Sequence, residues 1–186
     1  MAIWNVHGLE AKMDAQLKWT SIAYTYNQLS ISPQLMVDVG CNRAPLSLYL
    51  KKTIPTVYAV DIKETDHRCE DFNIFSRVID FYRWNELDYN SVDLIIDGCS
   101  IIHMDLEKSL EKISLLLKSG GYFICASDCV TNEANMEFIN PQGWIELAQK
   151  YGLELTSSFN FDYSNGFHLP YSTAELYILT MVFRRV

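Results

Sequence analysis

The sequence predicts an α/β fold, a doubly wound three-layer sandwich whose mostly parallel seven-stranded sheet ends in an antiparallel strand. Short apolar segments rich in β-branched residues alternate along the chain with segments of helical spacing, which is the pattern of βαβ units. The polar loop expected at 162–173 is too short for a helical crossover, so the last two strands should pair antiparallel.

Each predicted strand is a short apolar run, and several of these runs end at a residue suited to a turn or to ligand contact. Gly40 follows the first run, Asp61 lies at the end of the second, and Asp97 lies at the end of the fourth. The expected strands are 35–39, 56–62, 74–79, 92–97, 121–126, 153–161 and 174–183.

The predicted helices fill the gaps between these strands. A loosely helical pattern covers 13–29, and Pro45 is suited to the first position of a second helix. An apolar stripe with i, i+4, i+7 spacing covers 106–118. A last helix is expected at 141–151, where Gly152 supplies the left-handed stop.

Length and charge limit the class of protein. With 186 residues, of which 49% are hydrophobic, the chain is long enough for one compact domain and too apolar to be disordered. The 15 basic and 23 acidic residues give a net charge of −8, which opposes binding to nucleic acid and favours a neutral or cationic small ligand. We expect residues 1–34 to form a helical cap over the active site of a domain at 35–186.

The five cysteines form no CxxC pair, and no apolar run approaches the length of a membrane span. These features predict a cytoplasmic protein without membrane attachment, as a monomer or homodimer. Cys41, Cys99, Cys129 and His103 should lie near one edge of the sheet, but none of them shows the short spacing of zinc ligands, so no metal site is predicted.

Glycine is scarce, with 8 in 186 residues, yet Gly40 stands where the first strand must turn sharply. Asp61 follows about 20 residues later, at the spacing of an acid that accepts hydrogen bonds from ribose hydroxyls. Asp80 and Phe81 follow the third strand, where an acid and a ring could meet an adenine base. The Lys-Ser/Thr pair of a triphosphate-binding loop does not follow the first turn, so a nucleoside without phosphates is favoured.

These motifs together resemble the class I, Rossmann-like S-adenosylmethionine-dependent methyltransferases. Asp38-Val-Gly-Cys-Asn-Arg-Ala is similar to the family's glycine-rich turn, and Val57-Tyr-Ala-Val-Asp-Ile is similar to its second strand. Val92 to Met104 resembles the fourth-strand motif, and Leu115-Leu-Leu-Lys-Ser-Gly-Gly resembles the turn before the fifth strand. The resemblance covers about 35–186.

The resemblance implies that S-adenosyl-L-methionine is the cofactor and S-adenosyl-L-homocysteine the product. It assigns cofactor contacts to Asp38, Gly40, Cys41, Asn42, Asp61, Ile62, Asp80, Phe81, Asp97 and Gly98. Two glycines of the family turn are Asn42 and Ala44 here. Asn tolerates the left-handed conformation best among the other residues, and Ala44 adds only a methyl group. Arg43 would repel a sulfonium unless its side chain points to solvent or pairs with an acid.

The expected reaction is O- or N-methylation of a small-molecule acceptor, with His103 as candidate base. Trp19, Tyr24, His168 and Tyr171 are candidate acceptor contacts, although each is also suited to packing. Two alternatives remain open: a protein that keeps the cofactor for a reaction other than methylation, and a non-catalytic binding partner. A nicotinamide oxidoreductase is disfavoured because G-x-G-x-x-G is absent.

Overall fold

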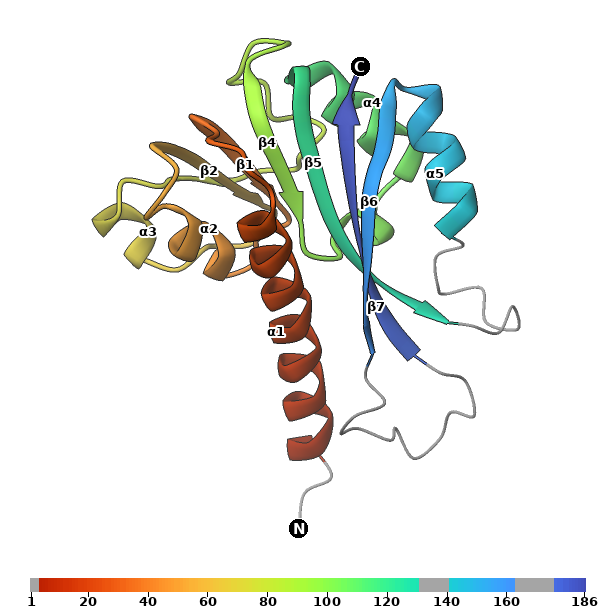
Figure 1. Cartoon of the computed structure of the whole chain (residues 1–186). Helices are drawn as coiled ribbons and strands as arrows, with labels where there is room; N and C mark the ends of the chain where they lie inside the picture. Colours follow the sequence, from red (N-terminus) through yellow and green to blue (C-terminus); the bar gives the residue numbers. More distant parts are fainter. Residues whose placement is uncertain (1–3, 131–140, 163–175) are drawn as a thin grey trace.

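Seven strands form one mixed sheet in the computed structural model, which describes residues 4–130, 141–162 and 176–186 (Figure 1). Their spatial order is β3-β2-β1-β4-β5-β7-β6. The strands are β1 (Leu35–Val39), β2 (Thr56–Asp61), β3 (Phe75–Val78), β4 (Val92–Asp97), β5 (Leu117–Val130), β6 (Leu153–Asp162) and β7 (Leu176–Arg185). The described helices are α1 (Trp4–Gln28), α2 (Pro45–Leu50), α3 (Arg68–Asp71), α4 (Leu106–Leu116), α5 (Pro141–Lys150) and the short 3₁₀ helix η1 (Ile101–His103).

The predicted fold class is confirmed. Strands β1 to β5 pair in parallel, and β7 pairs antiparallel with both β5 and β6. The strand order has a switch point between β1 and β4. The chain adds β2 and β3 on one side of β1 and then continues with β4 on the other side. In open α/β sheets a ligand binds at such a switch point, beyond the carboxyl ends of the strands.

Helices cover both faces of the sheet, and each face has its own hydrophobic core. Side chains of a strand alternate between the faces, so Met36 lies in the core beneath α1 and α2, whereas Val37 lies in the core beneath α4 and α5. Ile22 and Leu46 fill the first core from the helical side, and Trp144 fills the second. This arrangement is the predicted three-layer sandwich (Figure 1).

Helix α1 is longer than predicted and is anchored by its second half. It starts at Trp4 instead of residue 13, and in Figure 1 its first half extends past the carboxyl end of β4. Ile22 and Tyr26 are buried in the core, and Thr180 Oγ1 of β7 donates a 2.8 Å hydrogen bond to Ser21 Oγ. The second half of the segment expected to be a cap is therefore part of the same core as the sheet.

The boundary between α4 and β5 also differs from the expected one. The helix ends at Leu116 instead of Lys118, and the strand begins at Leu117 instead of Gly121. Leu117 pairs with Val92, and the register then shifts before Leu94 pairs with Tyr122. The glycine pair thus lies within an irregular strand start, where Gly120 has a φ of +80°. No helix in the described part of the chain is long and apolar enough to cross a membrane.

Candidate functional site

The turn after β1 has three residues in the left-handed conformation at alternate positions. The φ angles are +59° at Gly40, +52° at Asn42 and +55° at Ala44. Gly40 N donates to Val60 O at 2.8 Å, and Ala44 N donates to Cys41 O at 2.7 Å. The chain thus keeps a turn of three left-handed residues with one glycine. Ala44, at the amino end of α2, has a left-handed conformation that the sequence did not predict.

Gly40 is required by packing as well as by its backbone angle. A Cβ atom at this position would lie 2.0 Å from Ser100 Cβ. Ser100 follows β4, and its Oγ donates to Val39 O at 3.0 Å and lies in hydrogen-bonding contact with Asp97. Ser100 therefore joins the turn after β1 to the loop after β4, on the two sides of the switch point.

Asp61, at the end of β2, holds this turn through its carboxylate. Oδ2 accepts a 2.7 Å hydrogen bond from Asn42 N, and Oδ1 accepts a 2.9 Å hydrogen bond from Lys63 N. Each carboxylate oxygen has two lone pairs, so both can accept a further donor such as a ribose hydroxyl. The neighbouring Ile62 has an apolar side chain that is 70% exposed, which is available to cover one face of a bound base.

Asp38 and Asp97 are buried carboxyl groups beneath the turn. Burial raises the pKa of Asp38 to about 7, opposed by the 2.7 Å hydrogen bond from Ser47 Oγ and reinforced by the charges of Asp97 and Asp61. Burial also raises the pKa of Asp97 to about 6, while hydrogen bonds from Ser100 and Ile101 lower it. Both carboxyl groups are held within the fold by these hydrogen bonds.

Cys41 lies within the same turn and is 3% exposed. Burial and the charges of Asp38 and Asp61 raise the pKa of its thiol, so it stays protonated at neutral pH. A thiol that stays protonated is a poor nucleophile. The described residues contain no cluster of three or more His, Cys, Asp or Glu side chains that could hold a metal ion.

In the turn that follows β3, the side chains of Asp80 and Phe81 lie in different surroundings. Asp80 Oδ1 accepts a 2.9 Å hydrogen bond from Tyr82 N, and Asp80 O accepts hydrogen bonds from Arg83 N and Trp84 N. Asp80 is half-buried at this turn, whereas Phe81 is 2% exposed in the core beneath α4. The ring of Phe81 therefore cannot stack on a base in this structure, because the turn directs it into the core.

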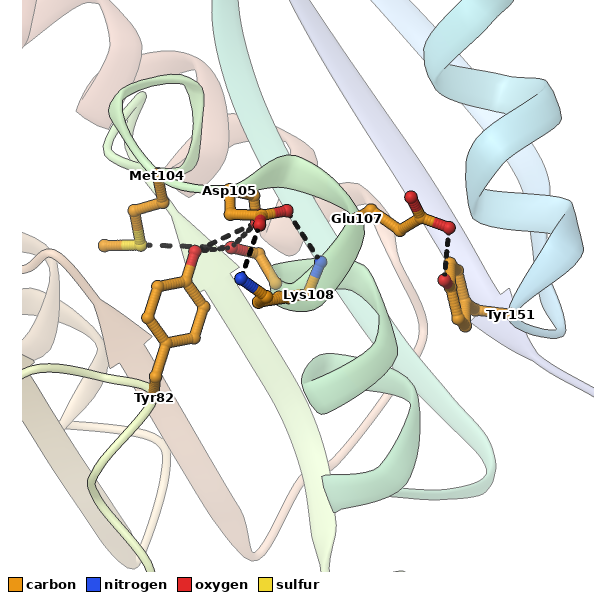
Figure 2. A network of polar contacts seen from close by, with 7 residues as sticks. Tyr82, Met104, Asp105, Glu107, Lys108 and Tyr151 are labelled. Carbon is orange, nitrogen blue, oxygen red and sulfur yellow. Dashed lines mark hydrogen bonds and ion pairs between the residues drawn. The ribbon is translucent and has the colours of Figure 1, made fainter.

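A polar network connects the loop after β3 to the start of α4 (Figure 2). Tyr82 Oη lies 2.9 Å from both Asp105 O and Ser109 Oγ. Asp105 is the N-cap of α4 and accepts a 3.2 Å hydrogen bond from Lys108 N. On the other side of the helix, Tyr151 Oη donates to Glu107 Oε1 at 2.8 Å.

Three of the candidate residues for the acceptor and the proton transfer are described by the structure, on α1 and η1. Trp19 packs on the loop after β4, since a Cβ atom at Gly98 would lie 3.2 Å from Cδ1 and Nε1 of the indole. Tyr24 is exposed on α1, and His103 is exposed at the end of η1. His168, Tyr171 and the side chain of Cys129 lie outside the described residues.

Arg43 is exposed. An exposed side chain can point to solvent, so the positive charge of Arg43 is compatible with a sulfonium ligand.

Several residues of the site were not predicted from the sequence. Ser47 and Ser100 bind the buried carboxyl groups, and Lys112 of α4 donates to Phe81 O and Trp84 O. Ser47 lies nine residues after Asp38, in the first turn of the helix that follows the motif, so this spacing could have indicated it. Ser100 is close in sequence to Asp97, but its contact with Val39 across the switch point has no local signal, and neither have the contacts of Lys112.

Comparison with known proteins agrees with this geometry. The family model described as a methyltransferase domain matches residues 37–125, which include the left-handed turn, Asp61, Asp80 and β4. The matched segment, 89 of the 186 residues, is similar to a methyltransferase domain. This match and the strand order confirm the predicted resemblance to the class I methyltransferases. None of the curated proteins is significantly similar to the chain in sequence.

Solved structures of methyltransferases share the fold of this domain. Geranyl diphosphate C-methyltransferase from Streptomyces coelicolor, in complex with geranyl diphosphate and S-adenosyl-L-homocysteine, is 14% identical with a TM-score of 0.74, over 92% of this chain and 81% of that chain. The 1,6-didemethyltoxoflavin-N1-methyltransferase of Burkholderia thailandensis, with S-adenosylhomocysteine bound, is 18% identical with a TM-score of 0.73, over 97% and 83%. A TehB-like methyltransferase from Corynebacterium glutamicum is 20% identical with a TM-score of 0.64, over 91% and 88%.

Proposed function

We propose that this protein is an enzyme that transfers the methyl group of S-adenosylmethionine to a small-molecule acceptor. The observation that carries the proposal is the left-handed turn at Gly40, Asn42 and Ala44, held by the Asp61 carboxylate at the switch point of the sheet. The methyltransferase domain match spans these residues, and the two solved complexes named above contain S-adenosylhomocysteine.

The residues of this site fit a cationic nucleoside cofactor. Asp61 would accept hydrogen bonds from the ribose hydroxyls, Ile62 would cover the adenine ring, and Asp80 would accept a hydrogen bond from the adenine amino group. The backbone of Gly40 and Asn42 would approach the amino-acid portion, with Gly98 at the far side of the switch point. We leave Phe81 out of this set because its ring is buried in the core.

The buried carboxyl groups of Asp38 and Asp97 would act through their charge, without touching the ligand. Bound S-adenosylmethionine would supply an electrophilic methyl group on a positively charged sulfur. The protein has to align the acceptor atom with that methyl group and exclude water. Trp19 and Tyr24 would bound the acceptor space from α1, and His103 would take a proton from an acceptor oxygen or nitrogen; His168 and Tyr171 stay candidate acceptor contacts.

Calorimetric titration with S-adenosylmethionine and S-adenosylhomocysteine tests the cofactor proposal. Asp61→Ala removes acceptors for both the ribose and the turn, and hydrogen bonds to a charged group contribute about 1.5–3 kcal/mol each. We therefore expect Asp61→Ala to weaken binding of both ligands by about 30-fold or more. The matched control is Asp88→Asn, an exposed carboxylate in the loop before β4 that should leave binding unchanged.

Absence of binding to the wild-type protein would contradict the proposal. Unchanged affinity in Asp61→Ala would remove the ribose assignment alone. The acceptor is tested separately, by incubating the protein with S-adenosylmethionine and a whole-cell extract and following methylated small molecules, methylated macromolecules and S-adenosylhomocysteine by mass spectrometry. Methylation confined to macromolecules would contradict a small-molecule acceptor.

A further inference from the structure

The connection between β3 and β4 is held in place by a helix that is distant in sequence. Residues 79–91 contain no helix and form an irregular loop that has Asp80 as its second residue. Tyr82 Oη attaches this loop to the first turn of α4 through Asp105 O and Ser109 Oγ, each at 2.9 Å (Figure 2). The loop therefore depends on α4 for its conformation.

Lys112, one helical turn further along α4, makes the second attachment. Its Nζ donates hydrogen bonds to Phe81 O and, at 2.5 Å, to Trp84 O. The same ammonium group lies 4.8 Å from the centroid of the Phe81 ring, in cation–π contact. One side chain thus binds two carbonyl groups and a ring of the segment 81–84, which follows Asp80 directly.

A lysine in this position requires a physical reason, because an ammonium group is costly to remove from water. Lys112 is half-buried, and this burial lowers its pKa, whereas the charge of Asp80 raises it. The positive charge is therefore compensated by the Asp80 carboxylate and by the two carbonyl oxygens. The Asp80 charge acts on Lys112 across the loop.

The Asp80 carboxylate has room for one more donor. Oδ1 accepts the hydrogen bond from Tyr82 N, and within the described part of the chain no donor is bonded to Oδ2. Because the backbone at 80–84 is fixed by Lys112, the direction of this carboxylate is fixed as well. An exocyclic amino group of a base is a donor that would pair with it, whereas a carbonyl oxygen at the same position would be repelled.

We propose that Lys112 is a positioning residue that sets the base specificity of the cofactor site by fixing Asp80 for the adenine amino group. The inference rests on the proposed function, since it concerns the adenine end of the same cofactor. Lys112 does not touch the base. It acts through the conformation of the loop and through its charge on Asp80.

The test compares S-adenosylhomocysteine with S-inosylhomocysteine, in which an oxygen replaces the adenine amino group, by calorimetry. The wild-type protein should prefer the adenine compound by about tenfold or more, the effect of about 1.4 kcal/mol of discrimination at a single hydrogen-bonding position. In Lys112→Met this preference should fall to about twofold or less, mainly through weaker binding of the adenine compound. Lys112→Arg keeps the charge and the donors and should retain most of the preference.

The matched control is Lys108→Met, on the same helix one turn earlier, whose side chain is 70% exposed and pairs with Asp105 Oδ2. This variant should keep the wild-type ratio of affinities. If Lys112 had a purely structural role, Lys112→Met would weaken the binding of both compounds equally and leave the ratio of their affinities unchanged. That result would overturn the inference. Equal binding of the two compounds by the wild-type protein would overturn it as well.

Failure of the proposed function has a different outcome, because the wild-type protein would then bind neither compound. If Lys112→Met does not unfold cooperatively, Tyr82→Phe replaces it in the titration. This variant removes the other attachment of the loop and should reduce the preference for adenine several-fold. An unchanged preference in Tyr82→Phe would count against the role of the loop.

Discussion

Gly40 is the residue on which the conformation of the site depends most. Its φ of +59° is strained for any other residue type, and the space for a side chain is already filled by Ser100. Left-handed backbone costs an L-residue about 1–2 kcal/mol, and forcing a methyl group into a filled space costs about 1–3 kcal/mol more. Asn42 is also left-handed, but it is exposed, so no neighbouring residue fills the space for its side chain.

We predict that Gly40→Ala lowers the free energy of unfolding by about 3 kcal/mol, measured by urea titration. Gly152→Ala is the matched control, because its φ is +72° but the nearest atom to a new Cβ would be 3.9 Å away. This control bears the backbone strain alone and should lose about 1 kcal/mol. A loss in Gly40→Ala no larger than that of the control would show that Ser100 yields to the methyl group.

At the scale of elements, the loop after β3 packs on the sheet as helices do elsewhere in the sandwich. Tyr58 of β2 stacks on Phe75 of β3 with ring centroids 4.9 Å apart, and Trp84 of the loop lies 5.5 Å from the ring of Tyr58. Arg77 lies 5.8 Å from the Tyr58 ring and pairs with Glu86 at 2.5 Å. Aromatic side chains thus cover this edge of the sheet without a regular helix.

Helix α1 provides the second prediction. Ile22 is fully buried between the sheet and α2, so Ile22→Ala should lower the free energy of unfolding by about 3 kcal/mol. Tyr24, two residues further on, is 50% exposed, and Tyr24→Ala should change stability by no more than about 0.5 kcal/mol. Thermal or urea unfolding measures both variants. Equal small effects would mean that α1 is a peripheral segment that the domain does not need.

At the scale of the whole molecule, the buried carboxyl groups tie stability to pH. The pKa of Asp38 is raised from its ordinary value of 3.8 to about 7, and that of Asp97 to about 6. Between about pH 4 and pH 7 the folded protein therefore binds more protons at these groups than the unfolded chain does. By linkage, their contribution makes the free energy of unfolding fall as the pH rises through this range.

We predict that Asp38→Asn flattens this fall. Asparagine can still accept the hydrogen bond from Ser47 Oγ, and it removes the Asp38 charge, which burial and the neighbouring charge of Asp97 disfavour. Urea midpoints at pH 4.5 and pH 8 should show the variant more stable than wild type at the higher pH only. Asp88→Asn, on the surface, should follow the wild-type curve. A parallel displacement of Asp38→Asn at both pH values would contradict the assignment.

The sequence predicted the central strands well because buried parallel strands are continuous apolar runs. The predicted bounds of 35–39 and 92–97 agree with β1 and β4. The start of α1 was missed because Gly8 and Glu10 interrupt the apolar spacing. Gly40 and Asp61 could be predicted from the motif, whereas Ser100 and Lys112 could not, since their roles depend on contacts with residues 60 and about 30 positions away.

The turn after β1 suggests how this motif is best defined. Its three left-handed positions are occupied by glycine, asparagine and alanine, and only the first has no room for a side chain. A sequence pattern that requires glycine at all three positions describes turns made of glycine alone. It does not match the turn of this protein. A definition by the sign of φ at alternate residues, together with the distance from the first position to the loop after β4, would include both kinds of turn.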